Sequence, residues 1–147
     1  VPLVRGVYDR DSGMKGAEDL LTVNPNLDII YGENEEMGLG AAAAVLAKGK
    51  QLWNFDTKKG IIVIGADGLV SGYNEIRAGR MTATINVNPV ANGRNLIEAI
   101  FWDRVLGWRI PKIILAPTSV VDKRNVDLNE AYVKWAQSVK YPSGGYK

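Results

Sequence analysis

Short apolar runs alternate with amphipathic stretches along most of the chain. The runs are rich in β-branched residues and are bounded by Gly, Pro, Asn or Asp, which is typical of strands buried on both faces. They predict strands at 3–7, 27–31, 60–64, 82–87 and 112–115. The stretches between them predict helices at 14–23, 34–47, 69–78, 90–106 and 128–139. This order predicts an α/β fold in which helices flank a parallel sheet.

The predicted helix at 34–47 begins with a cluster of polar residues. Asn34 stands at the N-cap position, and Glu35 and Glu36 fall in the first turn, where the helix dipole favours negative charge. A pair of catalytic carboxylates is the alternative interpretation, but adjacent helix positions do not face the same side. We therefore predict that Glu33, Glu35 and Glu36 are solvated charges at a helix start.

The composition excludes several classes of function. The 147 residues include no Cys and no His, which removes thiol chemistry, disulfides, thiolate metal sites and histidine-based catalysis. The net charge of +2 comes from 18 basic and 16 acidic residues that are mixed along the chain, without the basic stripe of a nucleic-acid-binding surface. No apolar run approaches the ~20 residues that span a bilayer. We expect a binding protein without cofactor, metal or nucleic-acid partner, not an enzyme.

Polar side chains stand where two of the predicted strands end. Asn34 follows the strand at 27–31, and Asp67 follows the strand at 60–64. The carboxyl ends of parallel strands meet at one edge of the sheet, where open α/β sheets bind ligands, so these residues predict a site for a small polar ligand. A helix N-cap at Asn34 and a turn at Asp67 are the simpler alternatives. The surrounding glycines match neither a dinucleotide fingerprint nor a phosphate loop.

The tripeptide Tyr8-Asp9-Arg10 follows the first predicted strand and reaches the same edge of the sheet. A surface ion pair beside a packed tyrosine would account for it. An arginine next to an aromatic ring is also suited to a polyhydroxylated ligand, because the guanidinium donates to hydroxyls while the ring covers apolar C–H faces.

A series of motifs resembles the ribose/galactose-type periplasmic sugar-binding proteins. In chain order they are YDR at 8–10, GAEDLL at 16–21, NPNLD at 24–28, ENEEM at 33–37, GADG at 65–68, IRAG at 76–79 and ATINVNP at 83–89. The segment 120–126 resembles the family's terminal segment. Each motif is modest alone, but their order and spacing are specific to that family.

The resemblance implies a receptor of two α/β lobes that closes on a sugar by hinge motion. It assigns ring stacking to Tyr8 and hydroxyl hydrogen bonds to Arg10, Asn34 and Asp67. Two positions depart from the family pattern, which often has a polar side chain at Val87 and an aromatic ring at Ala66. These departures bear on which sugar the site would accept.

The resemblance also implies that the chain is part of a larger assembly. Residues 1–88 would form most of the second lobe, 89–110 a helix that packs on the first lobe, and 111–147 the hinge return, terminal strand, last helix and tail. That helix carries a stripe of five large apolar residues, each of which would forgo ~1.5–3 kcal/mol if left in water: Leu96, Ile97, Ile100, Phe101 and Val105. We expect a carboxy-terminal portion of a longer protein, or one half of a split one.

Two functions follow from the resemblance. The first is the sugar-binding component of an ABC uptake system, located in the periplasm or otherwise outside the cytoplasmic membrane, whose partners are a monosaccharide-like ligand and the permease subunits. The second is the effector-binding domain of a LacI-type transcription repressor, which shares the fold. The pair Asp67-Gly68 favours the receptor, because the repressors more often have a second acid after the aspartate.

Overall fold

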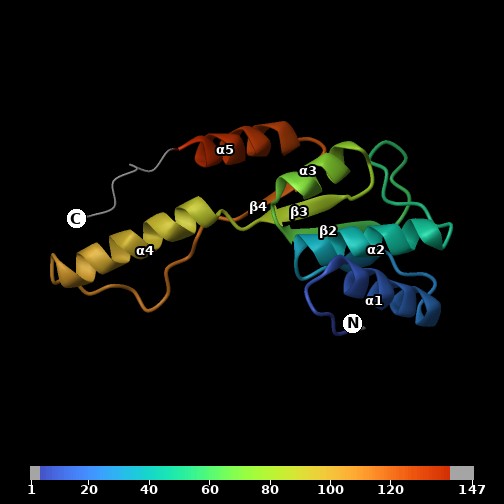
Figure 1. The fold of residues 1–147 in the computed structure, drawn as a ribbon, viewed down its shortest axis with the longest axis horizontal. Helices are drawn as coiled ribbons and strands as arrows, with labels where there is room; N and C mark the ends of the chain where they lie inside the picture. The colour runs from blue at the N-terminus through green and yellow to red at the C-terminus, as the bar shows by residue number, and fades with distance from the viewer. Residues whose placement is uncertain (1–3, 140–147) are drawn as a thin grey trace.

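Strands and helices alternate around one sheet (Figure 1). The computed structural model describes residues 4–139. Its helices are α1 (Arg10–Val23), α2 (Glu35–Ala47), α3 (Val70–Arg77), α4 (Pro89–Arg104) and α5 (Val126–Ser138), and its strands are β1 (Ile29–Tyr31), β2 (Ile62–Asp67), β3 (Ala83–Asn86) and β4 (Ser119–Asp122). The strand order is β1-β2-β3-β4, with β1, β2 and β3 parallel and β4 antiparallel to β3. The predicted α/β class with a mostly parallel, helix-flanked sheet is confirmed.

Two of the predicted strands are wrong. The part of the first that the structure describes, residues 4–7, has no strand pairing, and Leu3 lies outside the described residues. The segment 112–115 is also unpaired, and its apolar side chains Ile113 and Leu115 are exposed. A strand forms only where a neighbour accepts its hydrogen bonds, and here 119–122 takes that place beside β3.

The first helix begins earlier than its apolar pattern predicts. Asp9 is the N-cap, and its Oδ1 accepts a hydrogen bond of 2.7 Å from the Ser12 backbone N–H. A Cβ at Gly13 would overlap the backbone of Met37, so the absent side chain lets α1 and α2 approach closely. The start of α1 is thereby held against the start of α2.

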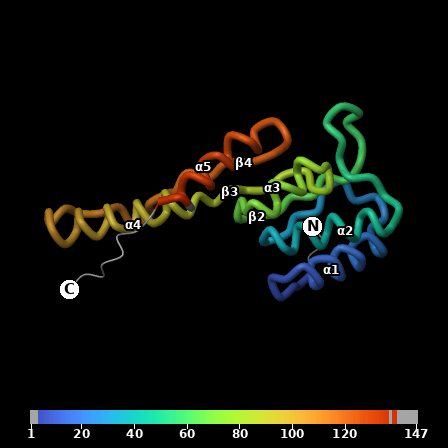
Figure 2. The backbone as a smooth tube through the Cα atoms, turned by 45° about the horizontal axis from the view of Figure 1, so that its top comes forward, coloured from blue at the N-terminus to red at the C-terminus, as the bar shows by residue number. Residues whose placement is uncertain are grey.

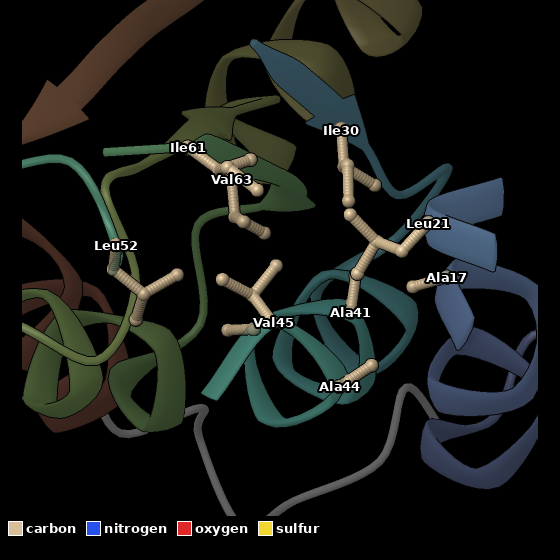
Figure 3. Close-up of a cluster of buried hydrophobic side chains, with 10 residues drawn as sticks. Ala17, Leu21, Ile30, Ala41, Ala44, Val45, Leu52, Ile61 and Val63 are labelled. Atoms are coloured by element: carbon tan, nitrogen blue, oxygen red, sulfur yellow. The ribbon is translucent and has the colours of Figure 1, made fainter. Parts of the chain in front are cut away.

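One face of the sheet carries the core. Ile30 and Val63 are paired in register and pack against α1 and α2 (Figure 3), in a cluster that includes Ala17, Leu21, Ala41, Ala44, Val45, Leu52 and Ile61. A second cluster joins β4 to α2, α3 and α5 through Leu39, Tyr73, Ile76, Met81, Val121 and Val126. Gly65 is paired with Thr84 and Thr84 with Val121, so Val121 lies on the same face of the sheet as Val63. Both clusters are therefore on one side of the sheet, which is covered by α1, α2, α3 and α5.

The other face of the sheet is open. Ile29 and Tyr31 of β1 and Val120 of β4 are exposed, and Ile62, Ile64 and Ile85 are only half-buried. β1 is also an edge strand among the described residues. A parallel sheet is usually covered on both faces, so this exposed face is suited to pack against another part of the protein.

Helix α4 extends away from the sheet in both views (Figures 1 and 2). Its start is fixed at the end of β3, because Asn88 caps it by accepting a hydrogen bond of 3.1 Å from the Ala91 N–H. One side of the helix buries Ala99, whereas the predicted apolar stripe is exposed along its length: Leu96, Ile97, Ile100, Phe101 and Val105.

Candidate ligand-binding site

The four predicted site residues lie at one edge of the sheet. Asp67 is the last residue of β2, and Asn34 follows β1 and caps α2. The side chain of Asn34 is hydrogen-bonded to the backbone of Tyr8, and Arg10 is paired with Glu36 in the first turn of α2. The fold thus brings together residues from three separate parts of the chain at the carboxyl ends of the strands.

Asn34 has two structural contacts and unused capacity. Its Oδ1 accepts from the Met37 N–H at 2.8 Å, which is the N-cap bond, and its Nδ2 donates to the Tyr8 carbonyl at 2.8 Å. A primary amide has two N–H groups and two oxygen lone pairs. One donor and one acceptor direction therefore remain for a ligand, and the side chain is only partly buried.

Asp67 is held in an unusual backbone conformation. Its φ is 111°, and the following Gly68 has φ 76°. A non-glycine residue in this region is costly and persists only where surrounding contacts fix it. One such contact is the hydrogen bond from the Glu35 backbone N–H to Asp67 Oδ2, at 3.3 Å. The partly exposed carboxylate is an acceptor at the edge of the sheet.

Tyr8 and Arg10 form the outer part of the site. Tyr8 has φ 63° and is 67% exposed. Packing against the core therefore does not explain why an aromatic ring stands at this position. Arg10 Nε donates to Glu36 Oε2 at 2.9 Å, and its Nη2 donates to Glu36 Oε1 at 3.3 Å. Such an exposed pair adds little stability, but two parallel bonds orient the guanidinium plane and leave further N–H groups free.

The prediction of a solvated charge is wrong for Glu35. Its side chain is fully buried at 0% exposure, beneath the turn that follows β2. Glu35 Oε2 accepts three hydrogen bonds, from Thr84 Oγ1 at 2.7 Å, the Gly68 N–H at 3.1 Å and the Leu69 N–H at 3.4 Å. Burial raises the pKa of Glu35, and its hydrogen bonds to Thr84, Leu69 and Gly68 oppose that rise.

A glycine on the neighbouring helix α3 makes room for the buried carboxylate. A Cβ at Gly72 on α3 would overlap Glu35 Oε1, so the carboxylate occupies space that the missing side chain leaves open. Gly72 and Glu35 are far apart along the chain, and only the packing of α3 against α2 relates them. Glu35 Oε1 and the hydroxyl of Tyr73 are both buried without a hydrogen-bond partner among residues 4–139.

The raised pKa predicts how Glu35→Gln changes stability with pH. The folded chain binds the Glu35 proton more tightly than the unfolded chain, so this contribution to stability is complete below the unfolded pKa and is lost as pH rises through the folded pKa. Glutamine cannot ionise. The difference in Tm, variant minus wild type, should therefore be more positive at pH 7.5 than at pH 4 in thermal unfolding. Glu18→Gln, at a partly exposed position on α1, is the control, and a pH-independent difference for Glu35→Gln would contradict the prediction.

A cavity adjoins Asp67 on the side of α5. It has a volume of about 310 Å³ and lies between the turn after β2, the start of α4 and α5. Leu69, Val70, Val90 and Val133 supply most of its apolar lining, and Asn86 lies beside Asp67 in the strand register. The edge of the sheet thus combines polar groups with an apolar recess. The described part of the chain contains no group of His, Cys, Asp and Glu that could hold a metal ion.

The fold and these polar groups are those of a binding domain for a small polar ligand. The chain has no thiol or imidazole. It gathers an amide, a carboxylate, a guanidinium and an exposed phenol at the edge of a parallel sheet, and these groups can hydrogen-bond such a ligand. The sequence also matches a known family of such proteins. The family described as periplasmic binding protein domain matches residues 3–101, and the chain belongs to this family.

Relatives with known names agree with the family. The chain is 37% identical over 86 residues to the D-allose-binding periplasmic protein of Escherichia coli, covering 58% of this chain and 25% of the relative. It is 32% identical over 111 residues to the ribose import binding protein of Bacillus subtilis, covering 75% of this chain and 33% of the relative. The chain thus spans about a third or less of the length of these relatives.

A solved structure shows the same fold. The ABC transporter periplasmic solute binding protein of Actinobacillus succinogenes, with bound D-allose, superposes with a TM-score of 0.65 at 26% identity. The match covers 82% of this chain and 40% of that protein. No helix among residues 4–139 is both long enough and apolar enough to cross a membrane.

Proposed function

We propose that this chain is the second lobe of a sugar-binding receptor for an ABC uptake system. The observation that carries the proposal is the convergence of Tyr8, Arg10, Asn34 and Asp67 at one edge of the sheet. Arg10 supplies donors only, Asp67 supplies acceptors, and Asn34 supplies both. A sugar hydroxyl both donates and accepts, so it can be bonded by each of these groups, while the Tyr8 ring covers an apolar face of the ligand.

The related proteins support a monosaccharide as ligand. Two of them are named for ribose import and for D-allose binding, and the solved relative holds D-allose. At this chain's site Val87 and Ala66 replace a polar group and an aromatic ring of the family pattern. Fewer polar contacts then come from this lobe, and Asn34, Asp67 and Arg10 carry a larger share of the recognition.

The opposing half of the site would come from a first lobe. Helix α4 extends away from the sheet (Figure 1), and its exposed apolar stripe is available to pack against such a lobe. The open sheet face and the edge of β1 would be covered by the earlier strands and helix of this lobe. On this proposal 1–88 form most of the second lobe, 89–110 the contact with the first, and 111–147 the return, terminal strand, last helix and tail. Residues 1–3 and 140–147 lie outside the described residues.

The mechanism is binding without chemical change. The two lobes close around the sugar by hinge motion, and the permease subunits of the transporter recognise the closed form. The name of one relative includes the word periplasmic, which supports a location outside the cytoplasmic membrane for this protein as well. The known relatives are import and binding proteins, which supports a receptor over both an enzyme and a LacI-type repressor.

Titration calorimetry on the complete receptor, meaning this chain together with its first lobe, tests the proposal. D-ribose and D-allose are titrated separately, followed by a broad panel of monosaccharides, and we expect saturable 1:1 binding of at least one of them. The recovered sugar should be unchanged after long incubation, as expected of a receptor and not of an enzyme. Absence of binding to a broad monosaccharide panel, or binding only to a phosphorylated or anionic solute, would contradict it.

A further inference from the structure

We propose that Glu35 is a positioning residue for ligand binding, which fixes the turn Asp67–Leu69 and through it the ligand-facing carboxylate of Asp67. This inference rests on the proposed function, since it concerns the same site. Glu35 itself has no path to a ligand, because its side chain is fully buried. It would act only through the backbone that it holds.

The contacts between Glu35 and the turn are reciprocal. The Glu35 backbone N–H donates to Asp67 Oδ2 at 3.3 Å, and Glu35 Oε2 accepts from the N–H groups of Gly68 and Leu69 at 3.1 and 3.4 Å. One residue therefore binds both the side chain of Asp67 and the backbone that follows it. The same oxygen accepts from Thr84 Oγ1 at 2.7 Å, which ties the arrangement to β3.

The turn needs an external support. Asp67 has φ 111° and Gly68 has φ 76°, both in the region that a side chain disfavours. A Cβ at Gly68 would lie 2.8 Å from Asn86 Cα, so the turn is pressed against β3 and its Gly68 N–H is shielded from water. Buried N–H groups require an acceptor. Glu35 supplies one from the first turn of α2.

The acceptor oxygens explain why a carboxylate is kept at this position. Its pKa is raised by burial, which means that the ionised form is disfavoured there. An apolar residue of similar volume would avoid that cost, but it would leave the N–H groups of Gly68 and Leu69 without their acceptor. What an apolar residue cannot do is accept from two consecutive backbone N–H groups, and these are the groups that set the direction of Asp67.

Gly72→Ala tests the proposal without altering Glu35. The new methyl group would occupy the space of Glu35 Oε1 and force the carboxylate away from Gly68 and Leu69. In the complete receptor we expect the affinity for D-ribose or D-allose, measured by titration calorimetry, to fall at least tenfold. Amide hydrogen exchange at Gly68 and Leu69 should become faster. Ser71→Ala, at the neighbouring exposed position on α3, should change neither measurement.

Two further variants separate packing from positioning. Adding Glu35→Ala to Gly72→Ala removes the overlap, so the Tm should recover relative to Gly72→Ala while the affinity stays low, because the turn still lacks its acceptor. Glu35→Gln keeps an acceptor oxygen in place and should bind within about threefold of wild type, as expected where hydrogen bonding and not charge is required.

The outcomes distinguish this inference from the proposed function. Wild-type affinity in the Gly72→Ala/Glu35→Ala variant, with a normal Tm, would overturn the positioning role while leaving the receptor function intact. A wild-type protein that binds no sugar of the broad monosaccharide panel would contradict the receptor function and, with it, the link to ligand. Unchanged hydrogen exchange at Gly68 and Leu69 in Gly72→Ala would overturn the proposed hold on the turn, whatever the ligand.

Discussion

Asn34→Ser and Asp67→Asn each weaken sugar binding by the complete receptor at least tenfold, and the combined variant weakens it about a hundredfold. Asn34→Ser would remove a donor and an acceptor worth about 0.5–1.5 kcal/mol each, and Asp67→Asn would remove a hydrogen bond to a charged group worth about 1.5–3 kcal/mol. About 1.4 kcal/mol corresponds to a factor of ten in Kd. Titration calorimetry with D-ribose and D-allose measures the effect.

The substitutions are chosen to spare the fold. Serine at position 34 still caps α2 by accepting from the Met37 N–H, but it is too short to reach a ligand. Asparagine at position 67 tolerates a positive φ and keeps an oxygen for the Glu35 N–H, so it removes the charge alone. The Tm should therefore fall little. Wild-type affinity in both single variants would exclude this edge as the binding site.

Control substitutions of the same chemical kind lie away from the edge. Asp19→Asn on α1 and Asn26→Ser in the turn before β1 change exposed residues outside the site. Both should leave the affinity within about twofold of wild type. A loss in these controls as large as in the site variants would point to net charge or general stability as the cause.

The sequence predicted the edge of the sheet well because that edge depends on local signals. Strands that end in polar residues and helices that begin with a cap are both encoded within a few positions, as at Asn34 and Asp67. The same signals explain why four of the five helices were predicted to within two residues of their observed bounds, whereas α1 begins four residues before its predicted start. Tyr8 was predicted at this edge because it follows a strand at 3–7. The described part of that segment, 4–7, is not a strand, but the Tyr8 carbonyl accepts a hydrogen bond from Asn34 Nδ2.

The errors arose where long-range packing decides. The segments 4–7 and 112–115 have strand-like composition but no neighbour to pair with, whereas 119–122 finds one in β3. Glu35 has the local pattern of a solvated first-turn acid, and its burial depends on Gly72 and Thr84, which lie on other elements. Hydrophobic pattern and capping rules contain no information about such neighbours.

Replacing both Ile97 and Ile100 on α4 by glutamate has opposite effects on the isolated chain and on the complete receptor. The side chains are 70% and 54% exposed in this chain, within the apolar stripe that we propose packs against the first lobe. The isolated 147-residue chain should self-associate through the stripe, and the double variant should be more nearly monomeric. In size-exclusion chromatography with light scattering, the apparent mass should fall toward that of one chain.

In the complete receptor the same two substitutions should destabilise the protein. Burying each isoleucine contributes about 1.5–3 kcal/mol, so the free energy of unfolding should fall by at least about 3 kcal/mol in denaturant titrations. Glutamate is a good helix former, so the loss would reflect the contact and not the helix itself.

Arg94→Gln, on an exposed polar position of α4, should have little effect in either form. The opposite signs identify a buried lobe contact, because an ordinary exposed helix would tolerate glutamate in both forms. A wild-type isolated chain that is a monomer with a cooperative melt would contradict it.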